Sequence, residues 1–229
     1  MPDYRRYAIY FTPRASGPLA EFGARWLGWD IAVGKAVAHP VLPGLPAPMA
    51  EITQTPQRYG FHATMKPPFS LGAGDLATLR DGLATLCQSH APVMLEGIIL
   101  ARLGRFLALV PHEASPALTQ LAAACVQDLD ALCAPMTEAE LERRRAARLT
   151  PEEEANLIRW GYPYVMERFR WHMTLTGKLP KAQVLEVERV LRPHIAPLLE
   201  GAFVIDALSL VGEDAEGMFH LIQRRALTG

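Results

Sequence analysis

A four-residue pattern occurs once in each half of the 229-residue chain: an aromatic residue, a histidine, an apolar residue and a threonine. The copies are Phe61-His62-Ala63-Thr64 and Trp171-His172-Met173-Thr174, and each is followed by an apolar residue, Met65 or Leu175. Side chains alternate between the two faces of a β-strand. A strand over either copy would therefore bury its aromatic and apolar residues and present the histidine and threonine together on the other face. Two such strands facing one groove would surround a small anion with two imidazoles and two hydroxyls.

The composition allows a sizeable core and argues against a nucleic-acid surface. Half of the residues are hydrophobic, and the formal net charge is −1. Because long nucleic acids usually bind to a basic surface, we expect no such partner. Cys87, Cys125 and Cys133 show no CxxC spacing, so we expect buried free thiols rather than a disulfide or a metal site.

The sequence also bears on localisation. The residues after Met1 run into a strand-like segment without the apolar run of a secretion signal. The longest apolar stretch, about 98–110, contains Arg102 and Arg105 and is too short to span a bilayer. We therefore expect a cytoplasmic protein that makes no membrane contact, and no obligate protein partner is evident.

Apolar periodicity and turn residues predict an alternation of strands and helices. Strands are expected at 7–11, 59–65 (stopped by two prolines), 93–100, 105–110, 169–177, 203–210 and 218–224. Helices are expected at 18–29, 76–88, after Ser115 and at 181–199, with an irregular connection at 38–56. The order "histidine strand, helix, strand, strand" occurs twice. This repetition predicts one domain over 1–229, of α+β class, built from two pseudo-duplicated lobes with interleaved segments.

A charged segment at about 136–160 interrupts this order and is predicted to be an inserted helical hairpin. Its second helix begins at a capping motif, Thr150-Pro151-Glu152-Glu153. Two interpretations stay open: a solvated hairpin, or a lid whose arginines (Arg143, Arg144, Arg145 and Arg148) include one that meets an anionic group of the substrate beyond the scissile phosphate.

The two histidine motifs and their flanks resemble those of a known superfamily, the 2H phosphoesterases. The segments 58–69 and 160–165, together with 6–13 and 26–30, look like the branch of that superfamily encoded in bacterial phosphonate-utilisation operons. The resemblance implies a bilobal α+β fold with antiparallel sheets facing a central cleft and helices on the outer faces. It also implies phosphodiester chemistry, on a cyclic phosphate, without a metal or other cofactor, and it assigns the functional roles to His62, Thr64, His172 and Thr174.

The residue types suit that chemistry. Opening a cyclic phosphodiester requires a base for the attacking water and an acid for the departing oxygen, and histidine suits both roles. The hydroxyls of Thr64 and Thr174 can donate hydrogen bonds to the non-bridging oxygens of the phosphate. No carboxylate lies inside either motif, so a metal site is not expected there.

Further substrate-binding candidates flank the motifs. Arg170 and Lys66 share strand parity with the histidines and could contact phosphate, and a solvated lysine is the alternative at Lys66. Tyr59 is a third candidate.

We expect a metal-independent phosphodiesterase that acts on a small phosphorylated substrate, possible examples being a sugar or nucleotide cyclic phosphate from phosphonate breakdown. Two alternatives stay open. One is an RNA 2′,3′-cyclic phosphodiesterase or 2′-5′ RNA ligase-like activity. The other is a non-catalytic phosphate- or nucleotide-binding module, against which the presence of two intact proton-transfer groups argues.

Overall fold

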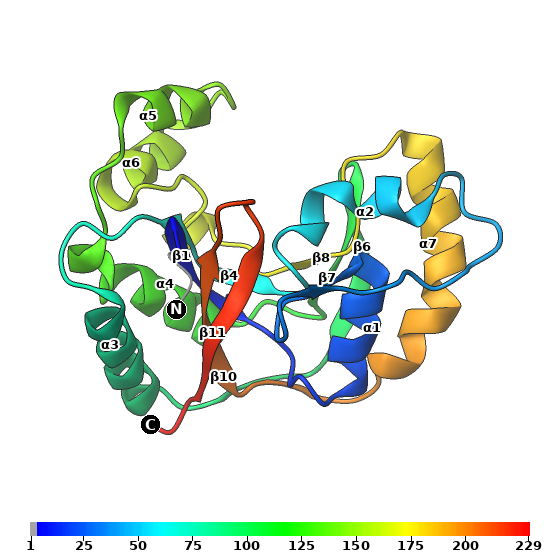
Figure 1. Cartoon of the computed structure of the whole chain (residues 1–229), viewed down its shortest axis with the longest axis horizontal. Helices are drawn as coiled ribbons and strands as arrows, with labels where there is room; N and C mark the ends of the chain where they lie inside the picture. Colours follow the sequence, from blue (N-terminus) through cyan, green and yellow to red (C-terminus); the bar gives the residue numbers. More distant parts are fainter. Residues whose placement is uncertain (1–3) are drawn as a thin grey trace.

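A computed structural model describes residues 4–229 of the chain, and its centre is a large antiparallel β-sheet (Figure 1). Seven strands form this sheet in the order β11-β10-β1-β4-β8-β7-β6. Their bounds are β1 Arg6–Phe11, β4 Ala63–Phe69, β6 Ile98–Leu103, β7 Phe106–Pro111, β8 Met173–Thr174, β10 Ala207–Glu213 and β11 Phe219–Ala226. Two short pairs complete the strands: β2 Trp29–Asp30 with β3 Lys35–Ala36, and β5 Val93–Leu95 with β9 Phe203–Ile205.

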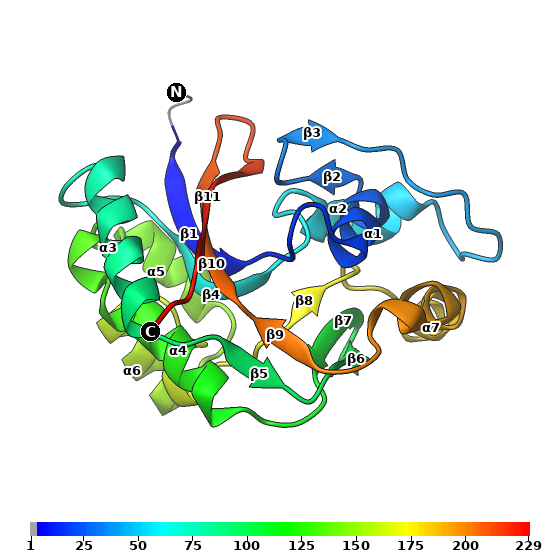
Figure 2. The same cartoon turned by 90° about the horizontal axis from the view of Figure 1, so that it is seen from below.

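The helices gather on two sides of the sheet (Figures 1 and 2). The helices on one side are α3 Leu76–Ser89, α4 Pro116–Gln127, α5 Glu138–Arg145 and α6 Pro151–Trp160. Those on the other side are α1 Pro18–Leu27, α2 Met49–Gln57 and α7 Lys181–Ile195. Short 3₁₀ turns lie at Asp130–Leu132, Met166–Arg168 and Ala196–Leu198.

Each side forms a lobe with its own part of the sheet. Helices α3 and α4 contact β10, β11 and β4, whereas α7 contacts β7 and α1 contacts α2. The chain passes repeatedly between the lobes, because β4 and α3 belong to one lobe, β6 and β7 to the other, and α4 to the first again. The expected α+β class is confirmed. The two expected sheets join into one continuous sheet, through a single residue pair between β4 and β8, Ala63 and Met173.

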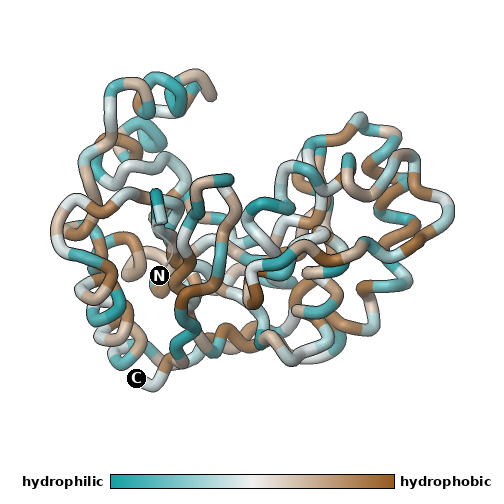
Figure 3. Tube along the Cα trace, viewed as in Figure 1, coloured by the Kyte–Doolittle hydropathy of each residue, from teal (hydrophilic) through white to brown (hydrophobic). Residues whose placement is uncertain are grey.

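Burial along the two histidine motifs follows the predicted alternation. Phe61, Ala63 and Met65 are buried, as are Trp171, Met173 and Leu175, while the histidines and threonines between them are partly exposed. The buried residues belong to one core shared by both lobes. Figure 3 shows apolar residues along the central strands, whereas the sequence of α5 is mainly hydrophilic. Both histidine–threonine pairs therefore lie on the face of the sheet opposite the shared core.

Several elements differ from the prediction, and the strands expected at 93–100 and 203–210 are each divided in two, into β5 and β6 and into β9 and β10. Strand β4 continues through Pro67 and Pro68, which lie at a register shift against β1 and beyond the one residue pair with β8; such irregular positions tolerate proline. The second histidine strand is shorter than expected, Met173–Thr174. Helix α2 lies inside the segment predicted to be irregular, and its one internal proline, Pro56, stands near its end.

The inserted segment forms the two expected helices, α5 and α6. Each begins with a capping box, at Thr137 with Glu140 and at Thr150 with Glu153. No helix within residues 4–229 is both long and apolar enough to cross a membrane.

Candidate active site

The two histidine motifs lie side by side at the junction of the lobes. The antiparallel pair Ala63–Met173 links β4 to β8. In this register Thr64 stands opposite His172 and His62 opposite Thr174, all on the face away from the core. A pocket of about 350 Å³ adjoins these residues; Thr64 and His172 line it, whereas His62 and Thr174 do not. The lobes thus bring together the four residues that the sequence singled out.

Both histidines are held in the same way. The Nδ1 atom of His62 lies 2.9 Å from the carbonyl oxygen of Gly60, and that of His172 lies 2.8 Å from the carbonyl oxygen of Arg170. A carbonyl only accepts, so each Nδ1 carries the proton and donates it. Each Nε2 is then the nitrogen that can exchange a proton with a substrate.

Gly60 supports this arrangement through its backbone. Its φ is +68°, a conformation that favours glycine, and a β-carbon here would lie 2.6 Å from Ile31. The turn that presents the Gly60 carbonyl to His62 therefore requires glycine.

His62 lies in an enclosed environment. Its ring stacks on that of the fully buried Tyr10, with centroids 3.8 Å apart, and its Nε2 lies 3.1 Å from the hydroxyl of Thr64. Although the edge of His62 reaches solvent, burial of the ring lowers its pKa to about 4, against an opposing hydrogen bond to Gly60. The charge of His172 lowers this pKa further, which shows that the two imidazoles are electrostatically coupled.

The remaining wall of this active-site pocket comes mainly from the loop between α6 and β8. Besides Thr64 and His172, the lining residues are Met65, Pro67, Tyr162, Tyr164, Val165, Arg168, Phe169 and Arg170. The tyrosines provide flat rings, and Arg168 and Arg170 provide positive charge.

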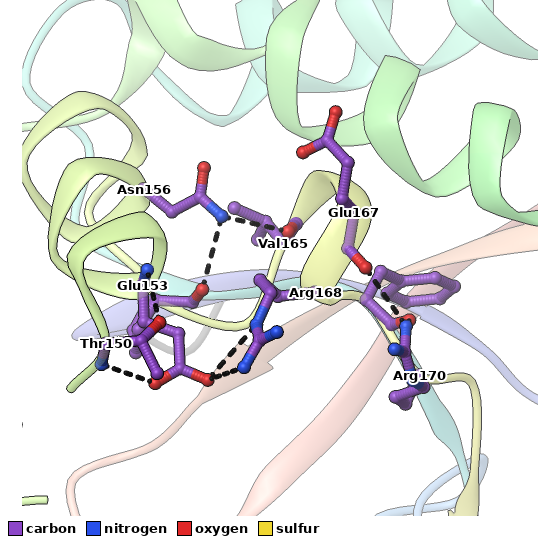
Figure 4. Close-up of polar contacts among 9 residues, drawn as sticks. Thr150, Glu153, Asn156, Val165, Glu167, Arg168 and Arg170 are labelled. Carbon is purple, nitrogen blue, oxygen red and sulfur yellow. Dashed lines mark hydrogen bonds and ion pairs between the residues drawn. The ribbon is translucent and has the colours of Figure 1, made fainter. Parts of the chain in front are cut away.

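Internal contacts fix this loop to α6 (Figure 4). Arg168 forms an ion pair with Glu153 at 2.7 Å, and the amide of Asn156 donates to the carbonyl of Val165 at 3.1 Å. Arg170, predicted to contact substrate, is exposed and donates to the carbonyls of Glu167 and Phe169 at 3.0 and 2.7 Å. Arg170 therefore lines the active-site pocket, and its guanidinium also forms hydrogen bonds within the same loop.

Lys66 does not share the face of His62, contrary to the expectation from strand parity. A register shift between β1 and β4 leaves Met65 as an extra residue, so that Tyr10 pairs with Thr64 but Ile9 pairs with Lys66. Lys66 is consequently turned to the core side, where it is 3% exposed and its Nζ donates to the carbonyl of Val126 in α4 at 3.0 Å. The bulge breaks the alternation on which the expectation depended.

Tyr59, another predicted site residue, lies beside His62 with ring centroids 6.1 Å apart. It does not line the active-site pocket. The guanidinium of Arg58 lies over its ring at 4.8 Å.

A charged network behind His62 was not predicted from the sequence. Glu213, 5% exposed, accepts from Arg6 at 2.8 Å and from Arg58 at 2.9 Å. Burial, and after it the neighbouring Tyr59, raise the pKa of Tyr10 well above its usual value, so the Tyr10 hydroxyl stays protonated. Tyr10 lies in the entirely apolar run Ala8–Phe11, where no alternation in the sequence marks one residue as facing a site.

One group of side chains in the described part of the chain could hold a metal ion: Glu96, His112 and Glu113, all exposed. It includes no residue of either histidine motif.

The second histidine motif, with only the last residue of the first, falls within the region that a known family shares. The model of a family described as a protein of unknown function, DUF1045, matches residues 64–220. This match begins at Thr64 and includes the whole of the second motif. The chain belongs to the DUF1045 family.

Two curated relatives of this DUF1045 chain are kinases by name. A "ribose 1,5-bisphosphate phosphokinase PhnN" of Janthinobacterium sp. (strain Marseille) is 37% identical over 93% of the chain and 48% of the relative. A protein of the same name from Laribacter hongkongensis (strain HLHK9) is 37% identical over 78% of the chain and 42% of the relative. The chain thus spans about half the length of these relatives.

Among solved structures, E. coli LigT in complex with NADP⁺ is similar to the chain with a TM-score of 0.46 and 14% identity. The similarity covers 99% of each chain.

Proposed function

We propose that this chain is a phosphodiesterase that opens a small cyclic phosphate by general acid–base catalysis, without a metal. The observation that carries the proposal is the matched anchoring of two histidines on adjoining strands. Each donates from Nδ1 to the carbonyl two residues earlier, and each keeps Nε2 for proton transfer. A site that only binds phosphate has no need of two such groups.

The environment of His62 assigns the roles of the two histidines. With a pKa of about 4, His62 is neutral at pH 7 and can accept a proton at Nε2. His62 therefore takes a proton from water as the water oxygen bonds to phosphorus. The role of acid then falls to His172, which donates a proton from Nε2 to the ester oxygen as its bond to phosphorus breaks. The product is a phosphomonoester with a free hydroxyl, and the two histidines have exchanged protonation states.

The threonines complete this mechanism. In the free protein the Thr64 hydroxyl lies 3.1 Å from His62 Nε2. When the attacking water occupies that position, the hydroxyl can turn to a non-bridging phosphate oxygen, where negative charge increases in the transition state. Thr174, opposite His62 in the register, serves a second non-bridging oxygen.

For the substrate we propose the cyclic phosphate of a phosphorylated sugar, in phosphonate breakdown. A pocket of about 350 Å³ suits a small molecule. The curated relatives are named for a kinase of ribose 1,5-bisphosphate, and opening a cyclic phosphate on a ribose phosphate gives a ribose bisphosphate.

A turnover screen tests the proposal. The purified chain is incubated, with and without EDTA, with cyclic sugar phosphates, 2′,3′-cyclic nucleotides and short RNAs that end in a cyclic phosphate. Hydrolysis of a small cyclic phosphate that survives EDTA supports the proposal. Loss in EDTA that zinc or manganese restores would overturn the mechanism, and preference for the RNA ends would favour the RNA-directed alternative.

A further inference from the structure

A second pocket, of about 400 Å³, lies between the inserted helices α5 and α6 on one side and strands β1 and β4 on the other. Its wall includes three basic residues, Arg6 from β1, Lys66 from β4 and Arg144 from α5. Ser70, Cys133, Met136, Thr137, Glu140, Trp160 and neighbouring backbone complete the wall. We call it the insertion pocket.

Arg144 is a basic residue of this pocket without a carboxylate partner among the described residues. No carboxylate of residues 4–229 lies within ion-pair distance of it, whereas the adjacent Arg145 is paired with Glu154 at 2.8 Å. The Nε of Arg144 is buried and has no hydrogen-bond partner in the described part of the chain. Its guanidinium lies 4.9 Å from the centroid of the Tyr162 ring, which holds the flat group in place.

The electrostatic surroundings of Arg144 leave room for an anion. Burial lowers the pKa of Arg144, and the charges of Arg143 and Arg6 act in the same direction, against Tyr162 and Glu140. Glu140 lines the same pocket, but its Oε2 accepts from the backbone N–H and the hydroxyl of Thr137 at 3.0 and 3.1 Å. Arg6 is likewise engaged, by Glu213, and Lys66 Nζ donates to the carbonyl of Val126 at 3.0 Å. An anion that enters the pocket would thus find its free donors on Arg144.

The insertion pocket adjoins the active-site pocket. Pro67 lines both, and Tyr162 lines the active-site pocket while its ring packs against Arg144. Thr64 and Pro67 are three residues apart on β4, a separation of about 10 Å along a strand. A small molecule can therefore present one phosphate to the histidines and a second anionic group to Arg144.

We propose that the insertion pocket binds a second phosphate group of the substrate, and that Arg144 determines this specificity. The inference deepens the proposed function and rests on it. The substrate class is then a cyclic phosphodiester that also carries a phosphomonoester. A planar guanidinium suits this group, because it can donate two parallel hydrogen bonds to phosphate oxygens.

The test compares two substrates and three variants. The substrates are ribose 1,2-cyclic phosphate with and without a phosphate on its 5-hydroxyl. The variants are Arg144→Gln, Arg144→Lys and, as a matched control, Arg143→Gln, which removes the same charge from an exposed position on the same helix.

We expect Arg144→Gln to raise KM for the 5-phosphorylated substrate roughly 10-fold or more with little change in kcat. For the substrate without the 5-phosphate, both KM and kcat should stay unchanged. Arg144→Lys should recover part of the loss, and Arg143→Gln should behave like the unmodified chain. Equal effects of Arg144→Gln on both substrates, or no effect on either, would overturn the inference.

A binding measurement separates this inference from the proposed function. Calorimetry with ribose 5-phosphate and with ribose needs no turnover. If no cyclic phosphate is hydrolysed but ribose 5-phosphate binds and Arg144→Gln weakens it, the proposed function fails and the anion site stands. If hydrolysis occurs but ribose 5-phosphate binding is indifferent to Arg144→Gln, the anion site fails alone.

Discussion

The rings of Tyr10 and His62 stack with their centroids 3.8 Å apart and their planes inclined by 23°. Tyr10 is 1% exposed, and its other neighbours include Phe219, with ring centroids 5.9 Å apart. The imidazole is thus fixed by a hydrogen bond at one nitrogen and by an aromatic surface along its face. Such a position limits both the orientation of the ring and its contact with water.

We expect Tyr10→Leu to affect catalysis more than Tyr10→Phe. Phenylalanine keeps the stacked ring, so turnover should stay within a few-fold of that of the unmodified chain. Leucine removes the flat surface, so the imidazole is no longer held in one orientation. The kcat should therefore fall while KM changes little. Turnover by both variants, with thermal unfolding as a control for stability, checks this. Equal turnover in the two variants would show that stacking does not position His62.

The depressed pKa of His62 predicts the acidic limb of the pH–rate profile. If His62 is the base, activity requires its neutral form, so kcat/KM should fall only as the pH drops toward about 4. An ordinary histidine would give an acidic limb near 6.5. The profile reports apparent values of the coupled pair, so NMR titration of His62 in the His172→Ala variant supplies the assignment. A limb at 6.5 or above would reverse the roles of the two histidines.

The same pKa predicts how stability depends on pH. His62 has a lower pKa in the folded state than in the unfolded chain, so the unfolded state binds the proton more tightly. The stabilisation is present above pH 6.5 and is lost as the pH falls from 6.5 through about 4. This pKa difference corresponds to at most about 3.4 kcal/mol of stability, and the partial exposure of His62 reduces the value. The free energy of unfolding is measured with denaturant at pH 7.5 and 4.5 for the unmodified chain and for His62→Gln. It should decrease less between these two pH values in the variant.

Alternating strand faces explain why the histidine motifs could be placed from sequence. Phe61, Ala63 and Met173 occupy the core positions that the two-residue period requires, and both histidines fall on the other face. The prediction from this two-residue period failed where a β-bulge interrupts the strand. The extra residue at Met65 turned Lys66 toward α4, and bulges of this kind have no marker in the residue types of this strand.

Tertiary contacts set the other limit on prediction from sequence. Tyr10 could not be recognised because both faces of its strand are buried. Composition suggested that one of four arginines in the insertion meets substrate, but it could not tell Arg144 from Arg145. The difference depends on Glu154, which is nine residues from Arg145 in sequence and bonded to it in space.

The threonines of the histidine strands should separate into catalytic and structural roles. Thr64→Val and Thr174→Val should each cost transition-state stabilisation of about 1.5–3 kcal/mol, the value of a hydrogen bond to a charged group. Thr176 follows the second strand but is buried, and its hydroxyl accepts from the backbone N–H of Leu107 at 3.0 Å and donates to Gly177.

Thr176→Val therefore serves as the contrast. It should lower the free energy of unfolding by about 1–3 kcal/mol, because a buried N–H loses its partner, and it should leave turnover of the folded protein nearly unchanged. Denaturant unfolding and kcat are measured for all three variants. A loss of stability without loss of turnover at Thr64 and Thr174 would remove them from the mechanism.

Replacement of the two histidines tests the whole mechanism. His62→Ala and His172→Ala should each lower kcat roughly 10²–10⁴-fold, the usual contribution of a general acid or base. The double variant should lose less than the product of the two single losses, because groups that act as a unit are not additive. His194→Ala, at an exposed position on α7, is the matched control and should keep full activity.

All four of these histidine variants should fold, since neither His62 nor His172 belongs to the shared core, and circular dichroism checks this before kinetics. Near-normal turnover in either single variant, on a substrate that the unmodified chain hydrolyses, would contradict two-histidine catalysis. Multiplicative losses in the double variant would indicate instead that the imidazoles contribute to separate steps, despite their electrostatic coupling across the junction of β4 and β8.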